Sequence, residues 1–315
     1  MAKVTKLNKP WLIAVWPGMG QVAISAGYYL ISKMEMHAMA EFSPRELFDI
    51  EHVEVKKGLI RSARLPRSRF FSWQDPHAER DLVVFIGEAQ PPIGRYSFCQ
   101  RLLEFAAELG VERVFTFAAM ATPMRPEHDS RVFAAAADDE TLAEFRRLEL
   151  KVLEDGQIGG LNGVLLGVAA EAGLKGGCLL GEIPHVFSQL PFPQASLAVL
   201  NVFKSMAKLD IDLSELAQQA EAMGHKLGEL LTQVEHAIEE QQSSDEPVEA
   251  FNPEQAAEES QLSPEDEQLI ESLFSQAQVS RSKAYELKRQ LDRLGVFDLY
   301  EDRFLDLFKK PENRA

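Results

Sequence analysis

The stretch WPGMGQVAIS, residues 16–25, contains a spacing that can bind phosphate. Gly18, Gly20 and Ala23 fit the pattern GxGxxA directly after the apolar run WLIAVW. In a dinucleotide-binding domain, such a turn holds a pyrophosphate at a helix N-terminus, and an acidic residue about twenty positions on binds the ribose. Glu41 stands twenty-one residues after Gly20. A tight turn with close strand-to-helix packing explains the same glycines, so a phosphate site and a purely structural turn both remain open.

Other polar residues follow predicted strands, at the end of a sheet where ligands bind. The candidate ligand-binding residues are Gly18, Gly20, Glu88, Thr122, Asn162, Glu182 and His185. The two carboxylates, Glu88 and Glu182, and the histidine could perform acid–base chemistry if they converge within hydrogen-bond reach. Capping of loops and contacts between subunits explain the same residues without a reaction.

Established catalytic and metal-binding patterns are absent from the sequence. It contains no HExxH, no paired CxxC, no GxxxxGK[ST] and no GxSxG. We therefore assign no catalytic residue, and we predict no metal site and no cofactor. The sequence favours a protein without catalytic activity and leaves an enzyme as the alternative.

The elements that must position these residues alternate between strands and helices. Continuous apolar runs are typical of parallel strands covered on both faces. They occupy residues 11–16, 36–42, 81–87, 113–119 and 177–183. Residues 97–110 follow the helical period and end at a glycine. Two further runs, 53–60 and 68–73, fit antiparallel additions to the sheet edge, so we predict an α/β fold with a mixed, mostly parallel sheet flanked by helices.

Charge and composition exclude several classes of partner. The net charge is −16, and residues 227–280 hold fourteen Asp and Glu without one Lys or Arg. We predict no nucleic-acid partner, because binding a nucleic-acid backbone needs clustered cations. No apolar run approaches the roughly 18 residues of a membrane span, so we expect no membrane contact. The two cysteines, Cys99 and Cys178, have neither disulfide nor metal spacing and favour the cytoplasm.

The second half of the chain predicts three segments. A capping pattern at Asp212 opens a helix to about residue 241, in which apolar residues recur alternately three and four apart. They are Leu213, Leu216, Ala220, Met223, Leu227, Leu230, Val234 and Ala237. This stripe fits either a coiled-coil seam or packing on the helix's own domain. The core therefore spans residues 1–241, followed by an acidic linker, 242–261, and a tethered three-helix module, 262–315.

Four motifs in order resemble the proteasome assembly chaperone family, in its archaeal and bacterial branch. They are WPGMGQVA, GEAQPP, GVERVFTFAAMATPMRP and EDGQIGGLNGVLLGVAAEAGLKGGCLLGEIPH, and the resemblance covers residues 10–240. It implies a phosphorylase/hydrolase-like core that forms homo-oligomers, which we expect to be trimers or larger, and an interaction or assembly-chaperone-like function with an unknown protein client. The alternative is a small-ligand-binding protein or a nucleotide- or phosphate-dependent enzyme that uses the Gly18–Gly20 loop with Glu88 and Glu182. The ending KKPENRA lacks the hydrophobic-Tyr-any motif by which some relatives dock on the proteasome.

Overall fold

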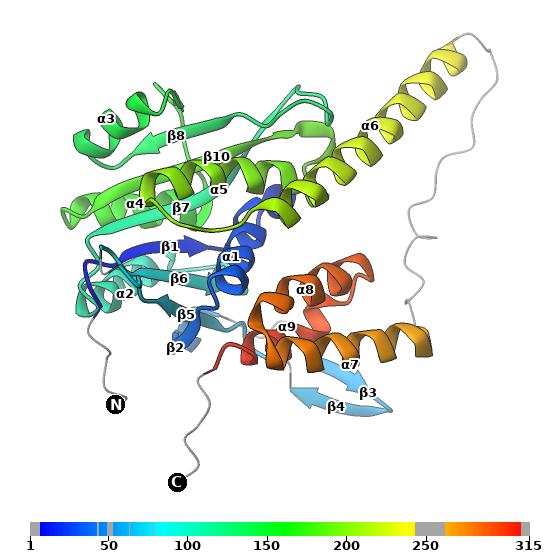
Figure 1. Ribbon diagram of the computed structural model, residues 1–315, viewed down its shortest axis with the longest axis horizontal. Helices are drawn as coiled ribbons and strands as arrows, with labels where there is room; N and C mark the ends of the chain where they lie inside the picture. The colour runs from blue at the N-terminus through cyan, green and yellow to red at the C-terminus, as the bar shows by residue number, and fades with distance from the viewer. Residues whose placement is uncertain are drawn as a thin grey trace.

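The computed structural model describes residues 7–42, 44–48, 53–62, 64–77, 79–242 and 262–309. Within them, a central sheet is covered by helices on both faces, and a group of C-terminal helices lies against one side of this core (Figure 1). The α/β class with a mixed sheet and additional C-terminal helices is therefore confirmed.

The main sheet has eight strands in the order β2-β5-β6-β1-β7-β10-β8-β9. Their bounds are β1 Trp11–Val15, β2 His37–Phe42, β5 Ser68–Trp73, β6 Leu82–Gly87, β7 Arg113–Thr122, β8 Val132–Ala136, β9 Lys151–Val152 and β10 Lys175–Pro184. The four central strands, β6, β1, β7 and β10, run parallel. Strands β1, β6 and β10 are almost wholly buried, and β7 is buried over its first half. Their carboxyl ends therefore meet at one edge of the sheet, which is where candidate polar residues were expected.

Two expectations about strands were wrong. The run 36–42 is not a strand covered on both faces, because β2 forms the sheet edge, antiparallel to β5, and is half-buried. The run 53–60 does not extend the main sheet. It forms a separate hairpin of β3 (Val53–Lys56) and β4 (Leu59–Ser62), while β5 takes the place beside β6.

Helices cover the sheet in two layers with separate hydrophobic cores. On one face α2 (Arg95–Glu108) packs against α4 (Gly160–Glu171), and on the other α1 (Val22–Lys33) packs against α5 (Pro193–Ala207). A shorter helix, α3 (Asp139–Arg147), packs on β8 and β9. The predicted helix at 97–110 is confirmed, and Gly110 ends it with φ +76.

The long helix α6 (Ser214–Gln242) first packs on α5 and then leaves the body of the molecule (Figure 1). Leu213, Leu216, Ala220 and Leu227 are buried, whereas Leu230 and Val234 are 40% and 53% exposed. Packing on the helix's own domain is therefore confirmed for the first part of the stripe, and the coiled-coil interpretation of the rest stays a prediction. Its first half packs on its own domain, and its second half lacks an apolar partner within the described residues.

The C-terminal helices are α7 (Pro264–Val279), α8 (Ala284–Arg293) and α9 (Phe297–Asp306). They pack on the core instead of remaining tethered beside it. Tyr29 stacks edge-on against Tyr285, with ring centroids 4.4 Å apart, and the N–H of Ala38 on β2 donates to the carbonyl of Phe308 at 2.7 Å. The free energy gained by burying these aromatic rings exceeds the conformational freedom that the helices lose on docking. The predicted linker, residues 242–261, lies outside the described residues except for Gln242, which ends α6, so the division of the chain stays a prediction.

Candidate functional site

The glycine turn connects β1 to α1, and its backbone N–H and C=O groups form hydrogen bonds with other backbone groups of the chain. Gly20 has φ +60, its N–H donates to the carbonyl of Ser188 at 2.8 Å, and its carbonyl accepts from the N–H of Phe192 at 2.9 Å. The N–H of Gln21 donates to the carbonyl of Gly18 at 3.0 Å. The N–H groups at positions 20 and 21, which a phosphate cradle would present, are therefore occupied by the protein itself.

Glu41 is placed far from this turn. In a dinucleotide-binding fold the second strand lies beside the first, but here β5 and β6 lie between β2 and β1. Three strand spacings correspond to roughly 14 Å. The Glu41 carboxylate instead accepts hydrogen bonds from Arg67, at 3.2 Å from Nε and 2.5 Å from a terminal nitrogen. The arrangement that would hold a ribose beside the glycine turn is not formed.

Three of the candidate residues meet at the ends of β7 and β10. The buried carboxylate of Glu182 accepts from the Thr122 hydroxyl at 2.7 Å and forms a bidentate ion pair with Arg131. His185 places Nδ1 3.1 Å from the carbonyl oxygen of Thr122. The Arg131 guanidinium lowers the pKa of Glu182 to about 2. A carboxylate held in this way is a poor general acid or base near neutral pH and acts as a clamp between β10 and the chain entering β8.

Asn162 lies in the first turn of α4, on the face of the sheet that α2 and α4 cover. Its carbonyl accepts from the Thr116 hydroxyl at 3.3 Å, and its buried side-chain oxygen has no hydrogen-bond partner. The Gln90 side chain caps this helix by accepting from the N–H of Leu161 at 3.1 Å. Gln90, which follows β6, therefore accepts a hydrogen bond from one of the backbone N–H groups at the start of α4.

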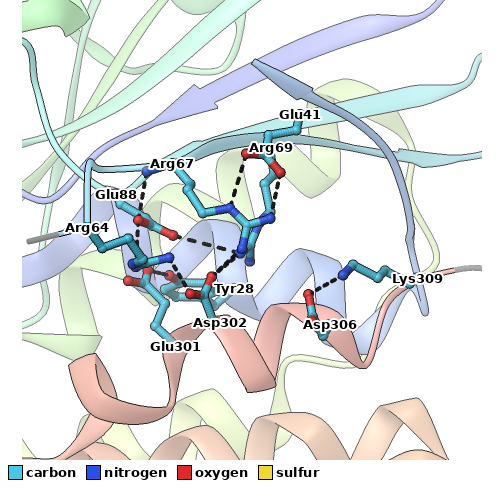
Figure 2. A network of polar contacts seen from close by, with 10 residues as sticks. All are labelled: Tyr28, Glu41, Arg64, Arg67, Arg69, Glu88, Glu301, Asp302, Asp306 and Lys309. Carbon is cyan, nitrogen blue, oxygen red and sulfur yellow. Dashed lines mark hydrogen bonds and ion pairs between the residues drawn. The ribbon is translucent and has the colours of Figure 1, made fainter. Parts of the chain in front are cut away.

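Glu88 follows β6 and belongs to a network of charges that joins the core to α9 (Figure 2). Its carboxylate accepts from the N–H of Arg67 at 2.7 Å and from Arg64 at 2.9 Å, and one of its oxygens is buried without a hydrogen bond. Burial raises the pKa of Glu88, against the effect of these donors. Glu88 and Glu182 are separated by β1 and β7, a distance of roughly 14 Å. These two carboxylates therefore cannot act on one bond together.

Four arginines, Arg61, Arg64, Arg67 and Arg69, form a local cluster in the chain before and within β5. Its partner is the chain's own helix α9, because Arg64, Arg67 and Arg69 all bond to Asp302. Burial opposes ionisation of Asp302, but the three guanidinium groups hold its pKa below the ordinary value. Arg61, the fourth arginine of the cluster, lies on the separate hairpin.

Beside this network, Glu301 of α9 accepts a hydrogen bond from the Tyr28 hydroxyl. Burial raises the pKa of Glu301 to about 6, and the nearby carboxylates of Glu88 and Asp298 raise it as well. Lys288 of α8 is 3% exposed, and its ammonium lies 2.6 Å from Asp292 and 4.2 Å from the Phe297 ring centre. Sequence reasoning missed this network, because its two halves lie more than 200 positions apart and neither half has a distinctive motif.

No group of three or more His, Cys, Asp or Glu within the described ranges could hold a metal ion. Across those same ranges, no helix is both long and apolar enough to cross a bilayer.

These features define a class: an α/β core whose polar residues mostly clamp strands and helices together, with further helices docked on its side. Residues 12–231 match the model of the PAC2 family. The chain belongs to this family.

Several solved structures and curated proteins are similar to the chain. Pyrococcus furiosus PbaB, described as an archaeal proteasome activator, is 28% identical with a TM-score of 0.61, over 73% of this chain and 95% of PbaB. A PAC2 family protein from Streptomyces avermitilis is 26% identical with a TM-score of 0.61, over 70% of this chain and 95% of that one. The Methanocaldococcus jannaschii protein MJ1210 is 25% identical over 70% of this chain and 82% of its own length. These matches confirm the resemblance inferred from the sequence motifs.

Proposed function

We propose that the protein is a homo-oligomeric, assembly-chaperone-like protein that acts by binding protein partners and has no catalytic activity. The resemblance to PbaB, a proteasome activator by its description, supports a role in the assembly or activation of a protein complex. The geometry of the candidate residues supports the absence of catalysis, because Glu88 and Glu182 are far apart and Glu182 is fixed by Arg131.

The observation that carries the proposal is the exposed second half of the apolar stripe on α6. Leu230 and Val234 continue the spacing of the buried positions that precede them, yet both are exposed. Apolar residues at heptad spacing on a projecting helix are typical of a seam that a second helix covers. We propose that the same helix of a neighbouring subunit covers it, in an assembly of three or more chains. Ala237, the next position, lies beyond the described side chains.

A cytoplasmic location fits the cysteines. Cys99 and Cys178 are buried free thiols, and burial raises the pKa of each to about 12. Both thiols are free instead of paired in a disulfide, as is usual for proteins of a reducing compartment.

Light scattering coupled to size-exclusion chromatography tests the proposal. The natural protein should elute with the mass of at least three 35.3 kDa chains. The double variant Leu230→Ser/Val234→Ser should shift to a smaller species. A matched control, Val279→Ser/Leu299→Ser, removes two side chains that are 90% and 78% exposed on other helices and should leave the mass unchanged. A monomeric natural protein, or equal masses for both variants, would overturn the proposal.

A further inference from the structure

A cavity of about 580 Å³ lies between the glycine turn, α6 and α8. Its volume is within the range of small-molecule sites, roughly 300–1,000 Å³. Gln21 and Ser25 contribute the wall at the start of α1, and Lys288, Arg289 and Arg293 contribute the wall on α8. The cavity therefore exists only because the C-terminal helices dock on the core.

Positive charge dominates the lining, although the whole protein carries −16. Lys226 of α6 and the three cations of α8 face one carboxylate, Asp292, whose oxygen lies 2.6 Å from the ammonium of Lys288. Along the described chain, Lys226 and Arg289 form neither an ion pair nor a hydrogen bond. Arg293 has its carboxylate partner, Asp266, only at 4.0 Å. Uncompensated cations around a concave surface concentrate positive potential there.

Further hydrogen-bond donors point to the same kind of ligand. Ser25 lies in the first turn of α1, a helix of 12 residues whose positive dipole end faces this cavity. The ammonium of Lys288, already paired with Asp292, also lines the cavity and adds a second donor. Donors and cations thus come from α1, α6 and α8 together.

The rest of the wall is apolar and limits where an anion can lie. Leu216, Met223 and Tyr285 line the cavity beside the cations. An adjoining cavity of about 250 Å³ is lined by Glu88, Asp298 and Glu301, whose carboxylates repel negative charge. An anionic group is therefore restricted to the cationic end, while an uncharged part can cover the apolar wall.

We propose that this cavity binds a small organic phosphate, with the phosphate between Lys226 and Arg289 and the organic part against Met223 and Tyr285. A phosphate is favoured over a carboxylate because four cations face one acidic side chain, and a dianion compensates this excess better than a monoanion. The inference goes beyond the proposed assembly function and does not depend on it. Because the ligand contacts core and C-terminal helices at once, its binding should also strengthen their docking.

Calorimetric titration of the full chain tests the proposal with three probes. Phenyl phosphate should bind at least tenfold more tightly than benzoate, which has the ring but a single charge, and than inorganic phosphate, which lacks the ring. The exposed side chains of Lys226 and Arg289 allow the double variant Lys226→Gln/Arg289→Gln to fold, as circular dichroism can verify. It should bind phenyl phosphate at least tenfold more weakly than the natural protein.

The matched control is Arg146→Gln/Arg147→Gln on α3, which removes the same charge from two exposed positions at the opposite end of the molecule (Figure 1). It should bind as the natural protein does. Amide hydrogen exchange in residues 284–293 should slow when phenyl phosphate is present. The proposal is overturned if phenyl phosphate does not bind, if inorganic phosphate binds equally well, or if both double variants bind alike.

Discussion

Glu301 is a buried carboxyl at the contact between α9 and the core, and replacing it tests how this contact depends on pH. Its carboxylate accepts from Tyr28 of α1, and it faces Glu88, Asp298 and Arg64. Burial and the two carboxylates disfavour its charge, while Tyr28 and Arg64 favour it. The result is a pKa raised from 4.5 to about 6. Glutamine at this position can still accept from Tyr28 but never becomes charged.

The sign and size of the effect follow from this shift. Since the folded-state pKa is raised, the stabilising contribution of protonated Glu301 is complete below about pH 4.5 and is lost as the pH rises through about 6. The difference between a pKa of 4.5 and one of about 6 corresponds to about 2 kcal/mol of unfolding free energy. Glu301→Gln should therefore match the natural protein at about pH 4.5 and be more stable by up to about 2 kcal/mol at about pH 7.5.

Urea unfolding, followed by circular dichroism across this pH range, measures the difference between the two proteins. The pKa of Glu88 is also raised, but Glu88 is present in both proteins, so its contribution largely cancels in the difference. Glu267→Gln, at an exposed position of α7, is the matched control and should show no such pH dependence. A stability difference between Glu301→Gln and the natural protein that stays constant with pH would refute the reasoning, as would one that shrinks as the pH rises.

Three further predictions address the glycine turn, the strand clamp and the docked helices. Gly20→Ala should cost about 1–2 kcal/mol in urea unfolding, because φ is +60 and the new methyl would approach Val22 to 3.2 Å, whereas Gly18→Ala has open space and should change little. Glu182→Gln should cost about 1–3 kcal/mol at neutral pH. Its disadvantage should shrink as the pH falls from 4.5 toward about 2, where the natural carboxylate becomes protonated. Deleting residues 262–315 uncovers the aromatic face of α1, so the truncated chain should melt at lower temperature and bind a hydrophobic dye, and unchanged melting would contradict this.

Local sequence patterns predicted the buried parallel strands and the helix at 97–110, because a continuous apolar run identifies each strand and the helical period identifies the helix. The position of β2 was not predictable in this way. Its apolar composition matches that of an inner strand, and only pairing with β5, more than 25 positions away in sequence, makes it the edge. The apolar stripe of α6 shows the same limit. Packing on α5 and packing on another chain require the same spacing, so the sequence could not divide the helix into its buried and exposed halves.

The candidate site was only partly predictable for a related reason. Residues after parallel strands were expected to meet, and Thr122, Glu182 and His185 do meet, because β7 and β10 are neighbours. Glu88 was expected near them, but the sheet order separates it from Glu182. The groups that surround Glu88 come from α9 and from the chain before β5, and pairings over such distances leave no periodic signal.

Helices α7–α9 lie outside the region that matches the family, so features that depend on them are not part of that match. The match to the PAC2 family ends at residue 231, before these helices begin. The cationic cavity needs Arg289 and Arg293 of α8, and the titrating contact needs Glu301 of α9. Both features therefore depend on residues outside the matched region. The exposed part of α6 that we propose for oligomer contacts lies at the end of the matched region. Disrupting Leu230 and Val234 should thus affect assembly without affecting phosphate binding, and disrupting Lys226 and Arg289 should do the reverse.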